Sequence, residues 1–207
     1  MAMTGVKIGL SLEIAEFKQR RIVEEAVNLF YFEGYENTTL DMLAGQLRVT
    51  KPFIYSYFKS KNELLFQVCQ TGIKLSQDAL DEGLASSGTA TERLRRITDH
   101  VGRIILKYQQ HIVVYVREEK NLSPDDSRRI REQRSLFDHR LAVLLEEGNN
   151  TGEFAIDNPL MTATTIGGTL SWMAFWFNPN GGITESEILL NTNLLIAKMW
   201  APVFLEK

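Results

Sequence analysis

Apolar side chains recur along most of the chain at every third or fourth position, which is the repeat of an amphipathic helix. Leu94, Ile97, Val101, Ile104 and Tyr108 follow this spacing in one segment. Alternation of apolar and polar residues with period two, the pattern of a half-buried strand, is almost absent. The pattern therefore predicts an all-α fold of about nine helices without a sheet.

Residues that start and stop helices divide this pattern into elements. Gly34 ends the first helix, Thr38 and Thr50 cap the next two, and Ser60 with Glu63 forms a capping box for the fourth. The predicted helices span residues 13–33, 38–47, 51–58, 60–80, 94–108, 111–120, 123–148, 159–177 and 184–204.

The two short helices, 38–47 and 51–58, are separated by about three residues, and each is too short to be stable alone. They must pack on the apolar face of the first helix, and such a three-helix unit is typical of a helix-turn-helix. The third helix carries the polar tips of Lys51, Tyr55 and Tyr57 beside apolar residues. It can therefore bury one side and present hydrogen-bond donors to DNA.

Charge is compatible with this interpretation. The chain has a net charge of -3. Residues 1–70 hold eight basic and eight acidic residues, whereas residues 41–61 hold four basic residues and one acid. The positive charge is thus concentrated near the short helices, as a small basic area on a slightly acidic body.

The run from Ile54 to Leu65, IYSYFKSKNELL, resembles the TetR (tetracycline-repressor-like) family of transcriptional regulators. The other matching residues are Phe30, Gly34, Tyr35, Thr38, Thr39, Leu43, Ala44, Val49, Thr50 and Lys51. The resemblance covers about residues 17–65. It implies two domains: residues 1–60 form a helix-turn-helix DNA-binding domain with an N-terminal arm, and residues 61–207 form a helical ligand-binding and dimerisation domain.

The resemblance also implies roles for individual residues of the helix-turn-helix. Thr38, Thr39, Tyr55 and Lys61 would hold phosphates, and Lys51, Phe53 and Tyr57 would face bases. Arg48 stands where the family usually has glycine, and Pro52 where it has a small residue. In the alternative interpretation, Tyr55 or Phe53 packs in the core, where Phe58 is expected. The full predicted DNA-binding set is Thr38, Thr39, Arg48, Thr50, Lys51, Pro52, Phe53, Tyr55, Tyr57, Lys59 and Lys61.

The last two helices are candidates for a dimer interface, because small residues on one face would let a partner helix approach closely. The family implies a four-helix bundle across a two-fold axis. In the alternative, these stripes close the core of the single chain. The predicted interface residues are Ala163, Gly167, Leu170, Ser171, Ala174, Ile188, Thr192, Leu195 and Met199.

Arg134 is a cation on an otherwise apolar stripe formed by Ile130, Phe137, Leu141 and Leu144. It either extends to solvent or anchors a largely apolar, anionic ligand. His111, Arg117 and Arg140 are weaker alternatives for that anchor. Aromatic residues would wall the cavity, although they too could be core. The predicted ligand-binding residues are Tyr108, Tyr115, Arg134, Phe137, Trp172 and Trp176.

Other features narrow the function. The single cysteine, Cys69, excludes an internal disulfide, and the three histidines lack metal-ligand spacing. We find no phosphate-binding loop and no nucleophile motif, so an enzyme is not expected, nor is a metal or cofactor. No segment is long and apolar enough for a membrane helix, and the N-terminus lacks signal-peptide features, so a cytoplasmic location is expected.

We therefore expect a homodimeric repressor that binds a palindromic double-stranded DNA operator. A small-molecule effector would release it, with a fatty acid, an acyl-CoA or an aromatic acid as the expected class. The alternatives are a helical protein-binding adaptor without DNA binding and a ligand-dependent activator.

Overall fold

The computed structural model describes the backbone of residues 2–199 and the side chains of residues 12–199. Within this range the regular structure is entirely helical, with nine α-helices and one 3-10 helix, which confirms the predicted all-α fold. The elements are α1 (Ala2–Glu33), α2 (Leu40–Leu47), α3 (Lys51–Tyr55), α4 (Lys61–Ala85), α5 (Ala90–Lys107), α6 (Gln109–Glu118), η1 (Glu119–Asn121), α7 (Pro124–Asn150), α8 (Pro159–Trp176) and α9 (Glu185–Ala197).

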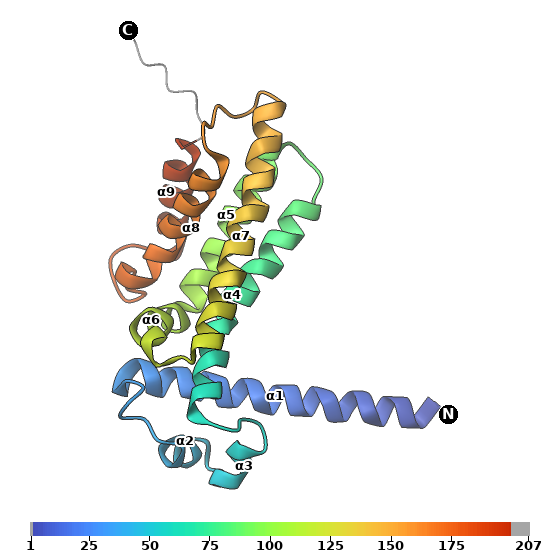
Figure 1. Ribbon diagram of the computed structural model, residues 1–207, viewed down its shortest axis with the longest axis vertical. Helices are drawn as coiled ribbons and strands as arrows, with labels where there is room; N and C mark the ends of the chain where they lie inside the picture. The colour runs from blue at the N-terminus through green and yellow to red at the C-terminus, as the bar shows by residue number, and fades with distance from the viewer. Residues whose placement is uncertain (1, 200–207) are drawn as a thin grey trace.

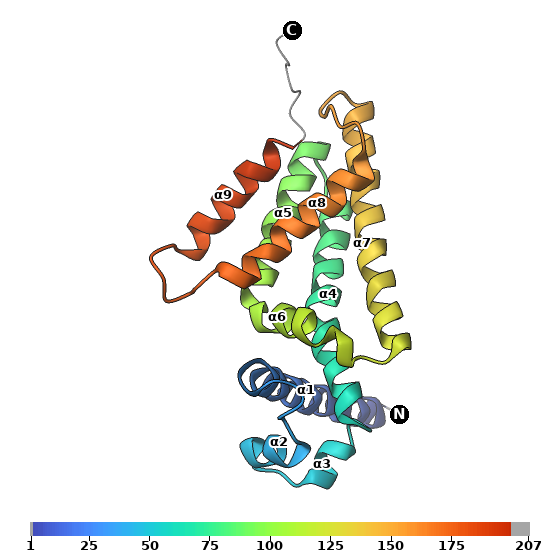
Figure 2. The ribbon, with the colours of Figure 1, turned by 60° about the vertical axis from the view of Figure 1, so that its left-hand side comes forward.

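The helices form a small N-terminal unit and a larger bundle (Figure 1). Helix α1 lies across one end of the molecule, with α2 and α3 on its outer side. Helix α4 leaves this unit and runs into the bundle, where it packs against α5 and α7. Helices α8 and α9 cover one side of the bundle, and α6 lies between α1 and the bundle (Figure 2).

Side-chain caps set the starts of the short helices, with one correction to the sequence prediction. The hydroxyl of Thr39, not that of Thr38, accepts a hydrogen bond from the backbone N–H of Met42 at 3.2 Å and caps α2. Thr38 instead donates its hydroxyl to the carbonyl of Gly34 at 2.8 Å. Gly34 has a φ of +81° after the end of α1, and this turn brings its carbonyl back toward Thr38.

The start of α4 differs from a capping box in one bond. Ser60 accepts from the backbone N–H of Glu63 at 3.0 Å, as predicted. The Glu63 carboxylate, however, accepts from the N–H of Lys59 at 2.7 Å rather than from that of Ser60. The helix therefore also fixes the end of the preceding turn.

Several helix boundaries differ from the prediction. Helix α3 ends at Tyr55 rather than residue 58, α4 continues to Ala85 rather than residue 80, and α5 begins at Ala90 rather than residue 94. Helix α1 begins at Ala2 rather than near residue 13, because a helix with no proline in its path extends by one hydrogen bond per residue. Helix α9 ends at Ala197, and residues 200–204 of the predicted last helix lie outside the described residues.

The apolar side chains form two cores that share helices α4, α6 and α7. One core joins α1, α2 and α3 to the first half of α4, and the other joins the second half of α4 to α5, α7, α8 and α9. Consecutive residues of α6 divide between them: Val113 belongs to the bundle core and Val114 to the N-terminal core. None of the described helices is long and apolar enough to cross a membrane.

Candidate functional site

The turn between α2 and α3 is built around Arg48, which adopts left-handed backbone angles of φ 54° and ψ 43°. Among residues 2–199, Arg48 is the one non-glycine residue that has a positive φ. This conformation costs a residue with a side chain about 1 kcal/mol. The side chain of Arg48 is exposed, so the strained turn presents a cation on the surface beside α3.

Helix α3 has a buried side and an open side. Ile54 is fully buried, whereas Lys51, Pro52 and Tyr55 are exposed, with 48% of Tyr55 accessible. The alternative in which Tyr55 packs in the core is therefore wrong for the single chain. Phe58, by contrast, is buried as expected.

Phe53 and Tyr57 are half-buried beside each other, with ring centroids 5.3 Å apart. The Lys51 ammonium lies 2.7 Å from the Asp41 carboxylate on α2, and this hydrogen bond raises the pKa of Lys51. Both partners are exposed, and such pairs contribute little to stability. Lys51 can therefore exchange Asp41 for another acceptor at small cost.

Two residues predicted to hold phosphates have partners inside the chain. Thr38 is 2% exposed. The Lys61 ammonium donates to the carbonyls of Tyr35 at 2.8 Å and Thr38 at 3.0 Å, and it lies 4.2 Å from the centre of the Tyr35 ring. Lys61 thus connects the first turn of α4 to the α1–α2 turn. The remaining predicted residues on this surface, Thr39, Thr50 and Lys59, are exposed.

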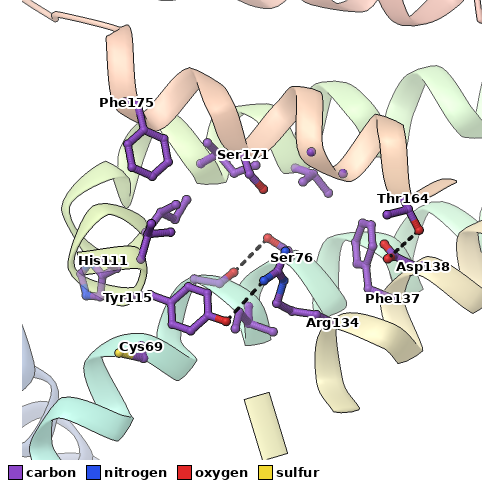
Figure 3. A pocket seen from close by; sticks show the side chains of 18 residues that line it. Cys69, Ser76, His111, Tyr115, Arg134, Phe137, Asp138, Thr164, Ser171 and Phe175 are labelled. Carbon is purple, nitrogen blue, oxygen red and sulfur yellow. Dashed lines mark hydrogen bonds between the residues drawn. The ribbon is translucent and has the colours of Figure 1, made fainter. Parts of the chain in front are cut away.

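A cavity of about 260 Å³ lies in the bundle between α4, α5, α6, α7 and α8 (Figure 3). Most of its wall is apolar. Four helices contribute polar side chains to it: Ser76 on α4, His111 and Tyr115 on α6, Arg134 and Asp138 on α7, and Thr164 and Ser171 on α8.

Arg134 lines the cavity and contacts α6, and its side chain is also exposed to solvent. Its guanidinium donates to the Tyr115 hydroxyl at 3.3 Å. Burial raises the pKa of Tyr115, so this hydroxyl keeps its proton at neutral pH and can itself donate to a ligand. Arg134 and Tyr115 together therefore offer N–H and O–H donors at one point of the wall.

Other arginines of α7 are paired with carboxylates. Arg128 pairs with Asp125, Arg129 with Asp126, Arg131 with Glu119 and Arg140 with Asp81. Among the described residues, no carboxylate lies within 4.0 Å of the Arg134 guanidinium. The cation at the cavity thus lacks the counter-charge that its neighbours have.

Two further titratable residues of the wall are uncharged at neutral pH. Burial lowers the pKa of His111 to about 4 and raises that of the Cys69 thiol to about 12. Burial also makes Cys69 an unreactive core thiol. The charges at the cavity are therefore those of Arg134 and Asp138.

The structure brings together half of the predicted ligand residues. Tyr115, Arg134 and Phe137 line the cavity. Tyr108 lies outside it, and so do Trp172 and Trp176, which are largely exposed on the outer face of α8. Sequence reasoning missed Asp138, although it stands four residues after Arg134 and shares its helix face.

The predicted dimer residues lie mainly on the inner side of α8 and α9. The chain's own core buries Ala163, Leu170, Ala174, Ile188 and Thr192. Gly167 and Ser171 line the cavity, Met199 packs on the bundle core, and Leu195 is exposed. For these buried residues, the structure therefore agrees with the alternative, in which the stripe closes the core of the single chain.

The outer side of the same two helices is apolar and open. Trp172 is 63% exposed and stacks on Phe175, with ring centroids 5.3 Å apart. The other exposed apolar residues on this surface, which we name the α8–α9 face, are Met161, Trp176, Leu190, Leu194 and Leu195.

Family models match most of the chain. Residues 22–68 match "Bacterial regulatory proteins, tetR family", and residues 87–199 match "Tetracyclin repressor-like, C-terminal domain". Among curated proteins, the chain is similar to the uncharacterized HTH-type transcriptional regulator YfiR of Bacillus subtilis. The two are 27% identical over 182 residues, which is 83% of this chain and 80% of YfiR.

Solved structures share the fold. The TetR family regulator PfmR of Thermus thermophilus has a TM-score of 0.79 at 28% identity, over 86% of this chain and 97% of PfmR. AibR in complex with isovaleryl coenzyme A and operator DNA has a TM-score of 0.75 at 22% identity, over 89% of this chain and 98% of AibR. At that identity, the likeness to AibR concerns the fold.

Proposed function

The chain belongs to the TetR family of transcriptional regulators, which are not enzymes, and we propose that it is a homodimeric repressor. It binds a palindromic operator and is released by a small ligand with an apolar body and an anionic group. The observation that carries the ligand class is Arg134, a cation without a carboxylate within 4.0 Å among the described residues, at a cavity whose wall is mainly apolar.

The DNA contact is assigned to the open side of the helix-turn-helix. Lys51 and Tyr55 are exposed on α3, the helix that enters the major groove in this type of unit. Thr39 and Thr50 stand at the N-termini of α2 and α3, where backbone N–H groups favour phosphate. Arg48 and Lys59 add cations beside them.

The dimer is assigned to the α8–α9 face. Exposed aromatic and leucine side chains gather there, and a contiguous apolar surface on a soluble domain marks an interaction site. Pairing through a two-fold axis would bury this surface against its own copy. It would also set the distance between the two copies of α3.

The switch is assigned to α6 and α4, because both helices contact the cavity and the N-terminal unit. Residues of α6 line the cavity, and the same helix packs against α1. A ligand that shifts α6 or α4 would change the spacing of the two recognition helices. They must reach successive major grooves about 34–36 Å apart, so a modest change weakens both half-sites together.

A test begins by selecting the operator from random duplexes and measuring its release by medium-chain fatty acids and their CoA thioesters. We expect Arg134→Met to bind operator like wild type. Its release should need at least about tenfold more of these ligands, because one charge-assisted contact is lost. Arg128→Met is the matched control, because Arg128 lies on the same helix and pairs with Asp125 outside the cavity.

Two results would contradict the proposal. Selection that enriches no palindrome would argue against dimeric operator binding. Release of Arg134→Met at wild-type ligand concentrations would argue against an anionic ligand held by this residue.

A further inference from the structure

One acid stands among the cations of the DNA-binding surface. Residues 41–61 hold four basic residues and a single acid, Asp41. Asp41 lies in the first turn of α2, and helices α2 and α3 lie side by side at the outer end of the molecule (Figures 1 and 2). A carboxylate on this surface repels the phosphates of every duplex, independently of its sequence. Asp41 therefore does not serve affinity for DNA in general.

Asp41 contacts the lysine that is assigned to base contacts. Its Oδ2 atom accepts a hydrogen bond from the Lys51 ammonium at 2.7 Å, and the side chains of Lys51 and Asp41 are 43% and 68% exposed. A lysine ammonium has three N–H donors, of which Asp41 takes one, so two donors remain. The carboxylate in turn keeps free lone pairs that can accept further hydrogen bonds. The pair thus presents donors and an acceptor side by side on the exposed surface.

A G·C base pair offers the matching pattern in the major groove. Guanine has two neighbouring acceptors, O6 and N7, and the paired cytosine has the N4 donor beside them. In an A·T pair, the adenine N6 donor separates the two acceptors, so the ammonium meets one acceptor at a time. We propose that Asp41 is a specificity-determining residue, which reads one G·C base pair of each half-site together with Lys51. Lys51 donates to guanine, and Asp41 accepts from cytosine.

The same carboxylate discriminates against DNA that lacks this base pair. When Lys51 binds a phosphate instead, the Asp41 carboxylate stays nearby and repels that phosphate. Non-specific binding depends almost entirely on phosphate contacts, so Asp41 weakens it more than it weakens operator binding. Specificity is the ratio of these two affinities, and Asp41 raises it. This inference rests on the proposed function, in which α3 enters the major groove of an operator.

Operator selection from random duplexes, followed by titrations of the selected operator, its single-base variants and an unrelated duplex, tests the inference. For the wild type we expect a G·C pair in each half-site whose replacement by A·T weakens binding about tenfold. Asp41→Asn should reduce this discrimination to about twofold and strengthen binding to the unrelated duplex about fivefold. Lys51→Met should reduce the same discrimination. The effects of the two substitutions should not add, because both act on one base pair.

Glu24→Gln is the matched control. Glu24 and Arg21 form an exposed pair of the same kind on α1, at 2.8 Å, and the substitution removes the same charge as Asp41→Asn. It should change neither the discrimination nor the binding of the unrelated duplex. If Glu24→Gln strengthens the unrelated duplex as much as Asp41→Asn does, net charge explains the effect and the inference is wrong.

Three other results would overturn the inference and leave the proposed function standing. The first is a selected operator without such a G·C pair, and the second is undiminished discrimination by Asp41→Asn. The third is equal weakening of all duplexes by Asp41→Asn, as expected if Asp41 only stabilises the N-terminus of α2. The proposed function fails separately, if the wild type selects no operator at all.

Discussion

At the residue scale, Lys61 and Lys59 show that neighbouring lysines of one motif have different surroundings. The Lys61 ammonium binds two carbonyls of the α1–α2 turn, whereas the Lys59 side chain is exposed. A lysine whose ammonium already donates hydrogen bonds to carbonyls must break these bonds before it can bind a phosphate. We therefore assign Lys61 to positioning the helix-turn-helix and Lys59 to direct phosphate contact.

This assignment gives a first prediction. Lys61→Ala should lower the free energy of unfolding by about 1–2 kcal/mol, because it removes charge-assisted hydrogen bonds to backbone carbonyls. Lys59→Ala should leave stability unchanged and reduce the salt dependence of DNA binding by about one phosphate contact. Urea unfolding and salt titrations of operator binding measure the two effects. Equal stability of both variants would show that the carbonyl contacts of Lys61 contribute nothing.

A second prediction concerns pH and His111. Because the folded-state pKa of about 4 lies below the ordinary value of 6.5, the unfolded chain binds the proton first as the pH falls. The stability present above pH 6.5 is therefore lost progressively down to about pH 4, with a loss of about 2 kcal/mol between pH 7 and pH 5.

His111→Gln should remove most of this dependence, and His100→Gln, at an exposed histidine of α5, should retain it. Urea unfolding at several pH values checks both. The pKa of Glu153 is lowered to about 2, so its contribution to stability changes only below pH 4.5. It therefore does not interfere with the measurement of His111 between pH 7 and pH 5. A wild-type stability that stays constant from pH 7 to pH 5 would contradict the buried, neutral His111.

Local chemistry explains which residue roles could be predicted from the sequence. Thr50, Ser60 and Ser123 were predictable caps, because each bond joins a side chain to a backbone N–H three residues away. The Lys61 contacts join residues 23 and 26 positions apart. A helical pattern contains no information about such pairs, so the motif alone favoured the phosphate role.

At the element scale, helices α8 and α9 were predicted apart from the end of α9, but their sequences did not determine which face is buried. Small residues such as Ala163 and Ala174 permit close approach to any neighbour. In the structure that neighbour is the chain's own core. The exposed tryptophans, which suggested a ligand cavity, lie on the opposite side. Which face is buried depends on α5 and α7, so helical periodicity could not decide it.

A third prediction follows for the α8–α9 face. Trp172→Arg and Leu194→Arg should each raise the dimer dissociation constant at least about a hundredfold, because pairing would bury an unpaired guanidinium. Val143→Arg should not, although Val143 on α7 is 64% exposed and thus as open as Trp172. Sedimentation velocity at micromolar concentration distinguishes monomer from dimer.

The variant Gly167→Leu tests whether the inner or the outer side of α8 forms the dimer interface. A side chain at residue 167 points toward the cavity, since a Cβ there would lie 3.5 Å from an Asp138 oxygen. This variant should remain dimeric and lose ligand binding. Dissociation of Gly167→Leu together with intact Trp172→Arg dimers would place the interface on the inner face instead.

At the scale of the whole molecule, the cavity and the helix-turn-helix share elements through which we propose that they are coupled. Val113 and Val114 connect α6 to the two cores, and α4 contributes to both. An equilibrium coupling of this kind must be reciprocal. If an effector weakens operator binding by some factor, the operator weakens effector binding by the same factor.

The fourth prediction concerns this coupling. Val114→Ala removes two methyl groups from the N-terminal core at a fully buried position. It should reduce the coupling factor while the ligand affinity of the DNA-free protein stays near the wild-type value. Ligand titrations with and without operator duplex give the factor directly. An unchanged factor in Val114→Ala would exclude this contact from the coupling.

The continuity of α4 also limits how modular the protein is. Leu64 and Leu65 of α4 complete the core beneath α1, α2 and α3, while Ala79 and Leu80 of the same helix belong to the other core. A chimaera fused at residue 60 would transfer the helix-turn-helix without the α4 residues that belong to its hydrophobic core. A join within α4, after Cys69 and before Ala79, would keep the α4 residues of that core, but Val114 of α6 and Ile130 of α7 would still come from the other parent. Evolution by exchange of whole sensor domains would face the same restriction, so recombination would have to preserve the residues of α6 and α7 that complete the N-terminal core.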